Sequence, residues 1–552
     1  MQKQNLKKAL SRFVLPFFIV CAPCFSAYIL TKNAFLCAVS IMVALCAFVV
    51  YIKRWHCVDF DSSSAVQRRL FVFVAVLLSL LSYFLCAVSM EGELLLEYPL
   101  KGSVDDYGCY VQTFDAFQKG RLDIDTEYDL SVLESLENPY DYSARKDATG
   151  EKYGVFWDRA FYNGKLYSYF GVAPIILLYY PVFFLTGKVL SDSLAAALLS
   201  EIFCCLAVAL VFLLCKRMEK KPPLLLALVF AAALPFGSLV FPTLTNANFY
   251  HIAVLSGMTF VMAFFVSFLC ATETPDGIKR KIIFALSGFS VAAIVASRPN
   301  MVLYVLIAIP FMFSVIKKCE YGKKSLIGDI SAFSVPMLVG GVLIMLYNNA
   351  RFGSPFDFGT AYQLTVTDTS RYSFELSMLV PSIYHYLLQR PSLNDIFPYL
   401  HMTNVRLADY GTDGGYVYLA RSIGAVIFPS SWGCLLLPVM SEQKTKLRTG
   451  IAAIAVAMFV AYFDMCFAGV HLRYVTDIMF VLTAVGIYSI MFCVCETKKG
   501  SNARIIAFSL AVAVVFATVL VSLPMIFDNE RLSIMRNSPD FFLFMANRTV
   551  SS

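Results

Sequence analysis

Charge is scarce in this sequence. Of its 552 residues, 15% are Asp, Glu, Lys or Arg, whereas 59% are hydrophobic, and the mean hydropathy is +0.68. This balance excludes a soluble globular protein. Apolar runs of about 18–23 residues recur along the chain, and each has the length of a bilayer-spanning helix. The sequence therefore predicts a polytopic membrane protein.

The sequence also lacks the common signatures of catalytic and cofactor sites. It has no metal-ligand spacing, no Ser/His/Asp arrangement and no glycine loop for phosphate. Most of the 16 cysteines lie inside apolar runs, and the polar stretch 91–171 holds only Cys109, which excludes a disulfide framework there. The net charge of +7 does not indicate a nucleic-acid partner, because Lys and Arg lie in short loops between apolar runs.

Thirteen apolar runs are candidate spans. The first follows a basic N-terminus like a signal peptide, but no small-x-small cleavage site is present, so we interpret it as a retained span. The runs are 13–30, 34–52, 70–90, 193–215, 224–241, 250–271, 282–297, 300–316, 331–347, 423–440, 450–468, 475–495 and 504–524.

These spans place every basic segment on one side of the membrane. The positive-inside rule makes that side cytoplasmic, so we expect a cytoplasmic N-terminus and an outer C-terminus, in a bacterial inner membrane. The apolar run 172–190 would reverse all later loops if it crossed, and Pro174 and Pro181 interrupt it. We therefore expect a re-entrant or interfacial segment there. The basic segments are the N-terminus, 53–69, 216–221, 279–281, 317–324, 444–448 and 498–504.

The expected fold is all-α, with about 13 transmembrane helices and a large first outer loop that contains interfacial helices and a hairpin. The chemically distinctive residues lie in the outer segments, which indicates that function resides on the outer face. The chain divides into N-terminal spans (1–90), an outer catalytic loop with the re-entrant segment (91–192), a central bundle (193–347), a second outer loop (348–422) and C-terminal spans with an outer tail (423–552).

An acidic pair opens an amphipathic pattern in the first outer loop. Apolar residues from Tyr107 to Phe117 recur at helical spacing, which predicts a helix over 104–119. Ser103 stands at the N-cap, and Asp106 lies three residues on, in the capping-box position, so Asp106 has a structural interpretation as well as a functional one. Asp105 has no such capping role and would lie in the first turn. The pair is a candidate base, or a base with a metal ligand.

Asn163-Gly164 predicts a β-hairpin between Phe156–Tyr162 and Lys165–Phe170. A two-residue turn pairs Tyr162 with Lys165, and Arg159 with Ser168. The aromatic residues of this hairpin are typical of an interfacial belt, and they also suit a wall of a lipid head-group site.

Three arginines stand where outer loops meet predicted spans. Arg351 lies three residues after Asn348, and it can bind a lipid phosphate with its planar fork or extend to ordinary head-groups. Arg473 precedes Asp477 by four residues, a spacing at which the two can pair. Arg298 lies in the turn Ser297-Arg-Pro-Asn300. All three are candidates for a phosphate site.

This arrangement resembles the GT-C superfamily of integral-membrane glycosyltransferases, which includes protein O-mannosyltransferases, aminoarabinose transferases that act on lipid A, and oligosaccharyltransferases. The resemblance covers most of the chain, but each motif is short. The acidic pair follows the third span rather than the first, and no Trp-Trp-Asp motif is present. The matching residues are Asp105-Asp106, Phe117-Gln-Lys-Gly-Arg-Leu122, Trp157-Asp158, Tyr167-Ser-Tyr-Phe-Gly-Val-Ala-Pro174 and Arg473-Tyr474.

The resemblance implies transfer of a sugar from a polyprenyl-phosphate donor to a glycan, lipid or protein acceptor on the outer face, beside the lipid bilayer. Asp105 would be the general base. Asp106 would assist it or bind a divalent cation, Mg²⁺ or Mn²⁺, and no other cofactor is expected. The donor and its phosphate would be bound by Arg351, Arg473, Lys165, Arg159, Arg298, Tyr169, Asn348 and Tyr474.

Three alternatives remain, and one of them is a structural or signalling membrane protein. A non-enzymatic transporter or flippase of lipid-linked sugars predicts intramembrane charges and inverted repeats, but the spans contain few charges, notably Glu201 and Asp464, and no repeat is apparent. A polysaccharide polymerase or ligase shares the long Arg-rich outer loops, but it has no evident need for an acidic pair at a helix start.

Overall fold

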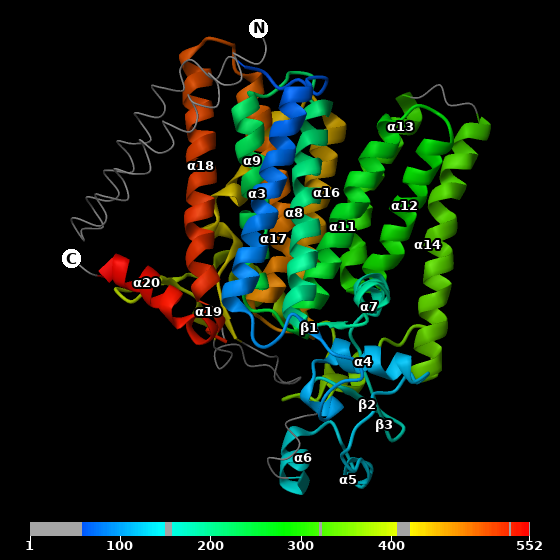
Figure 1. The fold of residues 1–552 in the computed structure, drawn as a ribbon. Coiled ribbons are helices and arrows are strands. Elements are labelled where there is room, and N and C mark those ends of the chain that lie inside the picture. The colour runs from blue at the N-terminus through cyan, green and yellow to red at the C-terminus, as the bar shows by residue number, and fades with distance from the viewer. Residues whose placement is uncertain (1–57, 150–156, 319–322, 406–419, 529–530, 551–552) are drawn as a thin grey trace.

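A bundle of long helices dominates the computed structural model, which describes residues 58–149, 157–318, 323–405, 420–528 and 531–550 (Figure 1). Within these residues, eight helical segments are long and apolar enough to cross a membrane. The chain is thus an all-α multi-pass membrane protein, as predicted; the predicted spans 13–30 and 34–52 lie outside the described residues. The eight segments are α3 (Ala65–Ser89), α8 (Asp192–Arg217), α9 (Leu224–Gly237) with α10 (Val240–Leu244), α11 (Phe249–Glu273), α14 (Lys323–Phe352), α16 (Lys444–Phe467), α17 (Leu472–Glu496) and α18 (Asn502–Phe527).

Three further predicted spans take shorter or tighter forms. Run 282–297 is α12 (Ile278–Val295), and run 300–316 is a 3₁₀ helix, Pro299–Ala308, that continues into α13 (Ile309–Lys318). Run 423–440 is largely a 3₁₀ helix, Pro429–Met440. Because a 3₁₀ helix rises about 2.0 Å per residue, fewer residues cover the same depth.

The 3₁₀ helix Pro429–Met440 lies directly against α17, and glycines make this contact possible. A Cβ atom on Gly433 would lie 2.2 Å from the carbonyl oxygen of Gly486 in α17. A Cβ atom on Gly486 would in turn lie 2.0 Å from the carbonyl oxygen of Ser430. The two backbones therefore touch without intervening side chains, which fixes α17 within the bundle.

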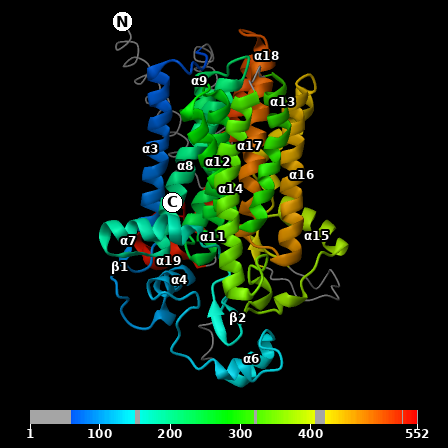
Figure 2. The same ribbon diagram turned by 90° about the vertical axis from the view of Figure 1, so that its right-hand side faces the viewer.

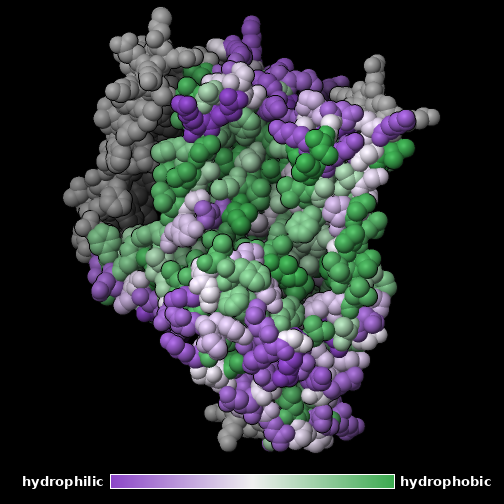
Figure 3. All heavy atoms as spheres, turned by 45° about the vertical axis from the view of Figure 1, so that its right-hand side comes forward, coloured by the Kyte–Doolittle hydropathy of each residue, from purple (hydrophilic) through white to green (hydrophobic). Residues whose placement is uncertain are grey.

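The two ends of the bundle differ in chemistry. The described basic segments cluster at one end, where Lys216 and Arg217 pair with Glu273, and Lys499 pairs with Asp59. The opposite end carries α4, the hairpin and α19 (Figure 1). Figure 3 shows a hydrophobic belt between two hydrophilic ends. We call the end with the hairpin the outer end, following the prediction from charge.

A short helical segment lies across the bundle axis at the outer end (Figure 2). It is a π turn, Ile175–Tyr179, followed by α7 (Tyr180–Thr186), and Gly187 ends it in the left-handed conformation. Twelve residues span about 18 Å as a helix, well short of a hydrocarbon core of about 30 Å. Ile176, Phe184 and Leu185 are exposed, which suits an interfacial position.

The predicted helix over 104–119 is interrupted. Val104–Asp106 forms a 3₁₀ turn, and α4 (Cys109–Gln118) begins after Gly108 in extended conformation. A Cβ atom on Gly108 would lie 2.5 Å from a carboxylate oxygen of Asp192, so the chain approaches α8 closely at this glycine. The Ser103 hydroxyl accepts the Asp105 amide proton rather than that of Asp106.

The hairpin is confirmed in the predicted register. β2 (Ala160–Tyr162) pairs antiparallel with β3 (Lys165–Tyr167), Tyr162 opposite Lys165, and Asn163 and Gly164 both have positive φ. The other short elements are α5 (Ser131–Glu134), α6 (Tyr142–Thr149), α15 (Leu379–Ile383), α19 (Ser533–Asn537), α20 (Pro539–Val550) and the strand pairs β1–β4 (Leu95–Leu96, Val189–Leu190), β5–β6 (Ser392–Leu393, Leu400–His401) and β7–β8 (Thr403–Asn404, Arg421–Ser422).

Candidate active site

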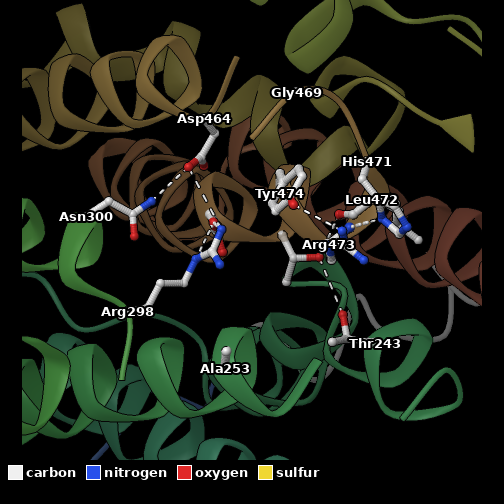
Figure 4. A network of polar contacts seen from close by, with 12 residues as sticks. Thr243, Ala253, Arg298, Asn300, Asp464, Gly469, His471, Leu472, Arg473 and Tyr474 are labelled. Carbon is white, nitrogen blue, oxygen red and sulfur yellow. Dashed lines mark hydrogen bonds and ion pairs between the residues drawn. The ribbon is translucent and has the colours of Figure 1, made fainter. Parts of the chain in front are cut away.

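Arg298 is the centre of a buried ionic cluster between two helices of the bundle. It precedes the 3₁₀ helix Pro299–Ala308, and its Nε donates to Asp477 Oδ2 of α17 at 2.7 Å. Its Nη2 donates to the same oxygen. Asp464 of α16 lies 3.9 Å from the same guanidinium, and its Oδ1 accepts a hydrogen bond from Asn300 at 2.8 Å (Figure 4). One guanidinium therefore bridges two buried carboxylates.

Arg473 lies next to this cluster, at the first turn of α17, and its charge has no such partner. Its Nη2 donates to the Tyr474 hydroxyl at 3.0 Å, and its guanidinium lies 4.4 Å from the ring centroid of Tyr250 in α11. Within the described part of the chain, no carboxylate forms an ion pair with it. Arg473 is also partly exposed, so it can reach an anion from outside.

Asp158 connects the outer loop to the residues around Arg473. Its Oδ2 accepts a hydrogen bond from the Tyr250 hydroxyl, and its Oδ1 accepts one from Tyr169 at 3.5 Å. Asp158 has a φ of 58°, which is uncommon for a residue other than glycine, and its amide donates to the Leu364 carbonyl. Such local strain is characteristic of functional sites, where surrounding contacts hold the residue in place.

Burial raises the pKa of the Asp158 carboxyl above the ordinary aspartate value, although the Tyr250 hydrogen bond and the Arg473 charge act in the opposite direction. A carboxyl whose pKa is raised in this way is a better proton acceptor than a solvated aspartate. Tyr250 joins the two charged groups, because its ring lies under Arg473 and its hydroxyl binds Asp158. The site therefore combines a proton acceptor with an anion-binding cation.

The predicted base Asp105 occupies a different setting. Its Oδ2 accepts hydrogen bonds from the Thr126 hydroxyl at 3.0 Å and from the Glu127 amide at 3.1 Å. Asp105 is half-buried, and Asp106 beside it is exposed. In this arrangement Asp105 anchors the loop that follows α4, and its catalytic role stays a prediction.

The other predicted cations anchor the outer loop. Arg351 donates to the Ser168 carbonyl, and this bond joins α14 to the residue that follows β3. Arg351 also donates to Asn348 Oδ1 at 2.8 Å. Arg159 is buried and donates to Gln112 Oε1 at 2.7 Å. Lys165 is exposed, 3.9 Å from Asp123. The structure thus brings Arg298, Arg473, Tyr474 and Tyr169 together and places Arg351, Asn348, Arg159 and Lys165 at structural contacts.

The predicted pairing of Arg473 with Asp477 is wrong. Asp477 accepts a hydrogen bond from Arg298 instead. The Arg473 side chain contacts Tyr474 and Tyr250. The spacing alone could not distinguish these partners, because Arg298 comes from another helix.

Sequence reasoning also missed Asp158, Tyr250, Asp477 and Asn300 as members of one network. Asp158 follows Trp157 in a stretch that the family resemblance had already picked out, and this was the available signal. Among the residues that the structure describes, no three His, Cys, Asp or Glu side chains are grouped to hold a metal ion. A divalent cation near Asp106 therefore stays a prediction.

Comparison with known proteins gives structural similarity without sequence similarity. No protein-family model matches the chain, and no curated protein matches it. ArnT from Cupriavidus metallidurans, solved with undecaprenyl phosphate, has a TM-score of 0.40 and 11% identity, over 87% of this chain and 77% of ArnT. The archaeal oligosaccharyltransferase AglB from Archaeoglobus fulgidus, solved with an inhibitory peptide and a dolichol-phosphate, has a TM-score of 0.38 and 12% identity, over 86% of this chain and 56% of AglB. At these values, a function has to be argued from the residues of the site.

Proposed function

We propose that this protein is a membrane glycosyltransferase that moves a sugar from a polyprenyl-phosphate donor to an acceptor hydroxyl at the outer end of the bundle. The observation that carries the proposal is the meeting of Arg473 and Asp158 at Tyr250. It brings a guanidinium that forms no ion pair with a carboxylate of the described residues to the same tyrosine as a half-buried carboxylate. The proposal covers any hydroxyl acceptor, whether glycan, lipid or protein.

The phosphate of the donor suits Arg473 better than the other arginines of the site. Arg298 already holds Asp477 and lies near Asp464, so an added phosphate would have to displace a buried carboxylate. Arg473 has two stacked aromatic rings and one hydroxyl acceptor, which leaves N–H donors of its fork for a phosphate. The apolar carrier chain would lie in the hydrophobic belt next to this end of the bundle.

The reaction needs one proton transfer and one bond exchange. The acceptor hydroxyl gives its proton to a carboxylate as its oxygen attacks the anomeric carbon of the donor sugar. The bond from that carbon to the phosphate oxygen breaks, and polyprenyl phosphate leaves with the electron pair. Arg473 stabilises the negative charge that develops on the leaving phosphate.

Asp158 is the carboxylate that the geometry favours as base, because it lies beside Arg473 and its pKa is raised. Asp105 is the base that the family resemblance favours. Asp158→Asn and Asp105→Asn distinguish them: the variant of the true base loses transfer while it still binds the donor. The variant of the other residue keeps turnover, or fails to fold.

Transfer itself is tested with the purified full-length protein and a panel of labelled short-chain polyprenyl-phosphate sugars. Release of polyprenyl phosphate together with a glycosylated product supports the proposal. Binding of the lipid-linked sugar without any turnover would instead favour a flippase, and absence of both would contradict the proposal.

The face on which transfer occurs is tested by cysteine labelling in intact cells. Lys165 and Lys499 lie at opposite ends of the bundle and are exposed over 57% and 70% of their side chains. A cysteine replacing Lys165 should react with a membrane-impermeant maleimide, whereas one replacing Lys499 should react only after permeabilisation. The reverse pattern would place the site on the cytoplasmic face.

A further inference from the structure

Two buried carboxyl groups share one guanidinium in the cluster at Arg298. Asp464 is 1% exposed and Asp477 is 0% exposed. Within the described part of the chain, Arg298 is the one cation that pairs with either of them. If both carboxyl groups were ionised, the cluster would hold a net negative charge away from water, which is costly.

Only two of the four carboxyl oxygens receive a hydrogen bond from another group. Asp477 Oδ2 accepts from Arg298, and Asp464 Oδ1 accepts from Asn300 at 2.8 Å (Figure 4). Asp464 Oδ2 and Asp477 Oδ1 are buried, and no donor among the described residues reaches them. The cluster therefore lacks one positive charge and has two acceptors left over.

The tyrosine hydroxyls near the pair are already engaged elsewhere. The Tyr304 hydroxyl donates to the backbone carbonyl of Asp477 at 2.6 Å, and the Tyr386 hydroxyl donates to that of Gly469 at 2.8 Å. A hydroxyl has a single proton, so neither can serve a carboxyl oxygen as well.

A proton shared by the two carboxyl groups accounts for all of this. The groups are in direct hydrogen-bonding contact with each other. Two ionised carboxylates cannot make that bond, because each only accepts, whereas a protonated carboxyl group donates. One proton on Asp464 Oδ2, donated to Asp477 Oδ1, gives both oxygens a partner and removes the net charge. A water molecule between them would leave the charge in place, and the direct contact leaves no space for it.

We infer that Asp464 and Asp477 form a buried acid pair that holds one proton at neutral pH, with Asp464 as its neutral member. Asp477 is the ionised member, because Nε and Nη2 of Arg298 both donate to it, whereas Asp464 lies 3.9 Å from that guanidinium. The pair as a whole carries one negative charge, which Arg298 balances. The other charged or titratable side chains that face the pair are Arg473, Tyr474, Tyr304 and Tyr386.

The proton also affects the charge available at Arg473. The guanidinium carbons of Arg298 and Arg473 lie 5.4 and 4.9 Å from the ring centroid of Tyr474, so they are at most about 10 Å apart. An ionised Asp464 would oppose anion binding at Arg473, on the order of tenfold at about 10 Å and an effective dielectric constant of about 20. The neutral Asp464 leaves the Arg473 charge available to the donor phosphate. This role, unlike the proton itself, rests on the proposed function.

Infrared spectroscopy of the full-length protein in nanodiscs tests the proton directly. At about pH 8, solvated aspartates are ionised, because their pKa is about 3.9. The wild-type protein should still show the C=O band of a protonated carboxyl group, and isotopic labelling of the aspartate carboxyl carbon should shift that band. Asp464→Asn should remove the band, because the asparagine amide can make both hydrogen bonds without an acidic proton. The matched control Asp368→Asn, at an outer-loop aspartate that pairs with Arg371, should keep it.

A wild-type spectrum without an aspartate band would overturn the inference even if Asp464→Asn failed to fold, and so would a band that persists in a folded Asp464→Asn protein. Binding of labelled polyprenyl phosphate tests the role at Arg473. Asp464→Asn should bind it within about threefold of wild type, because one neutral side chain replaces another, whereas a gain on the order of tenfold would show that Asp464 is ionised. A wild-type protein that binds no polyprenyl phosphate would contradict the proposed function, and the infrared band would still decide the proton.

Discussion

Removal of the Arg473 guanidinium should reduce transfer far more than it reduces stability. Among the described residues, the Arg473 side chain makes one hydrogen bond, to Tyr474, and it stacks on Tyr250 and Tyr474. Loss of such stacking costs about 0.5–1 kcal/mol at a partly exposed site, so Arg473→Met should unfold at nearly the wild-type temperature. Loss of one donor aimed at developing negative charge costs about 2.7–4 kcal/mol of transition-state stabilisation, or about 10²–10³ in rate.

The assay is release of polyprenyl phosphate from the preferred donor, measured as kcat/KM with purified full-length protein. Arg473→Met should lower kcat/KM by about two to three orders of magnitude. Arg473→Lys should fall between this variant and wild type, because lysine keeps the charge but not the planar fork. Arg371→Met is the matched control, since this outer-loop arginine is 66% exposed and pairs with Asp368 away from the network. A value for Arg473→Met within threefold of wild type would refute the assignment of the phosphate to Arg473.

Three further predictions concern the cluster, the pH response and the packing of α17. Arg298→Met should destabilise the protein by about 3–5 kcal/mol, because Asp477 and Asp464 are then buried without their cation. The added change Asp477→Leu should recover the part of the loss in thermal unfolding that is due to Asp477, and an additive loss in the double variant would show that Arg298 and Asp477 do not act as a unit. If Asp158 is the base, kcat/KM should fall as pH decreases through a pKa above the ordinary aspartate value of about 3.9, because the base must be deprotonated; an unchanged acid limb in a still active Asp158→Asn protein would assign that limb to another group. Gly433→Ala should cost about 1–3 kcal/mol, because its Cβ would lie 2.2 Å from the Gly486 carbonyl oxygen, whereas Gly341→Ala in α14, with no atom within 4 Å, should be tolerated; thermal unfolding of the two variants compares them directly.

Much of the topology could be predicted because hydrocarbon imposes a simple rule on the chain. Backbone groups in a bilayer have to be satisfied within a segment, so a long apolar run becomes a helix whatever it packs against. The runs that became α3, α8 and α18 required no tertiary information for this reason. The hairpin at Asn163-Gly164 was equally local, since Asn-Gly favours a turn with two positive φ values, and such a turn matches the twist of the flanking strands.

Tertiary structure decided which polar residues meet. Asp158, Tyr250 and Arg473 come from an outer loop and two different helices, and no local pattern relates residues so far apart in sequence. Arg473 is four residues from Asp477, but the buried Asp477 accepts hydrogen bonds from Arg298, which lies at the start of the 3₁₀ helix Pro299–Ala308 and is far away in the sequence. Burial and direction of side chains were therefore settled by helix packing, whereas helix formation was settled by hydrophobicity along the chain.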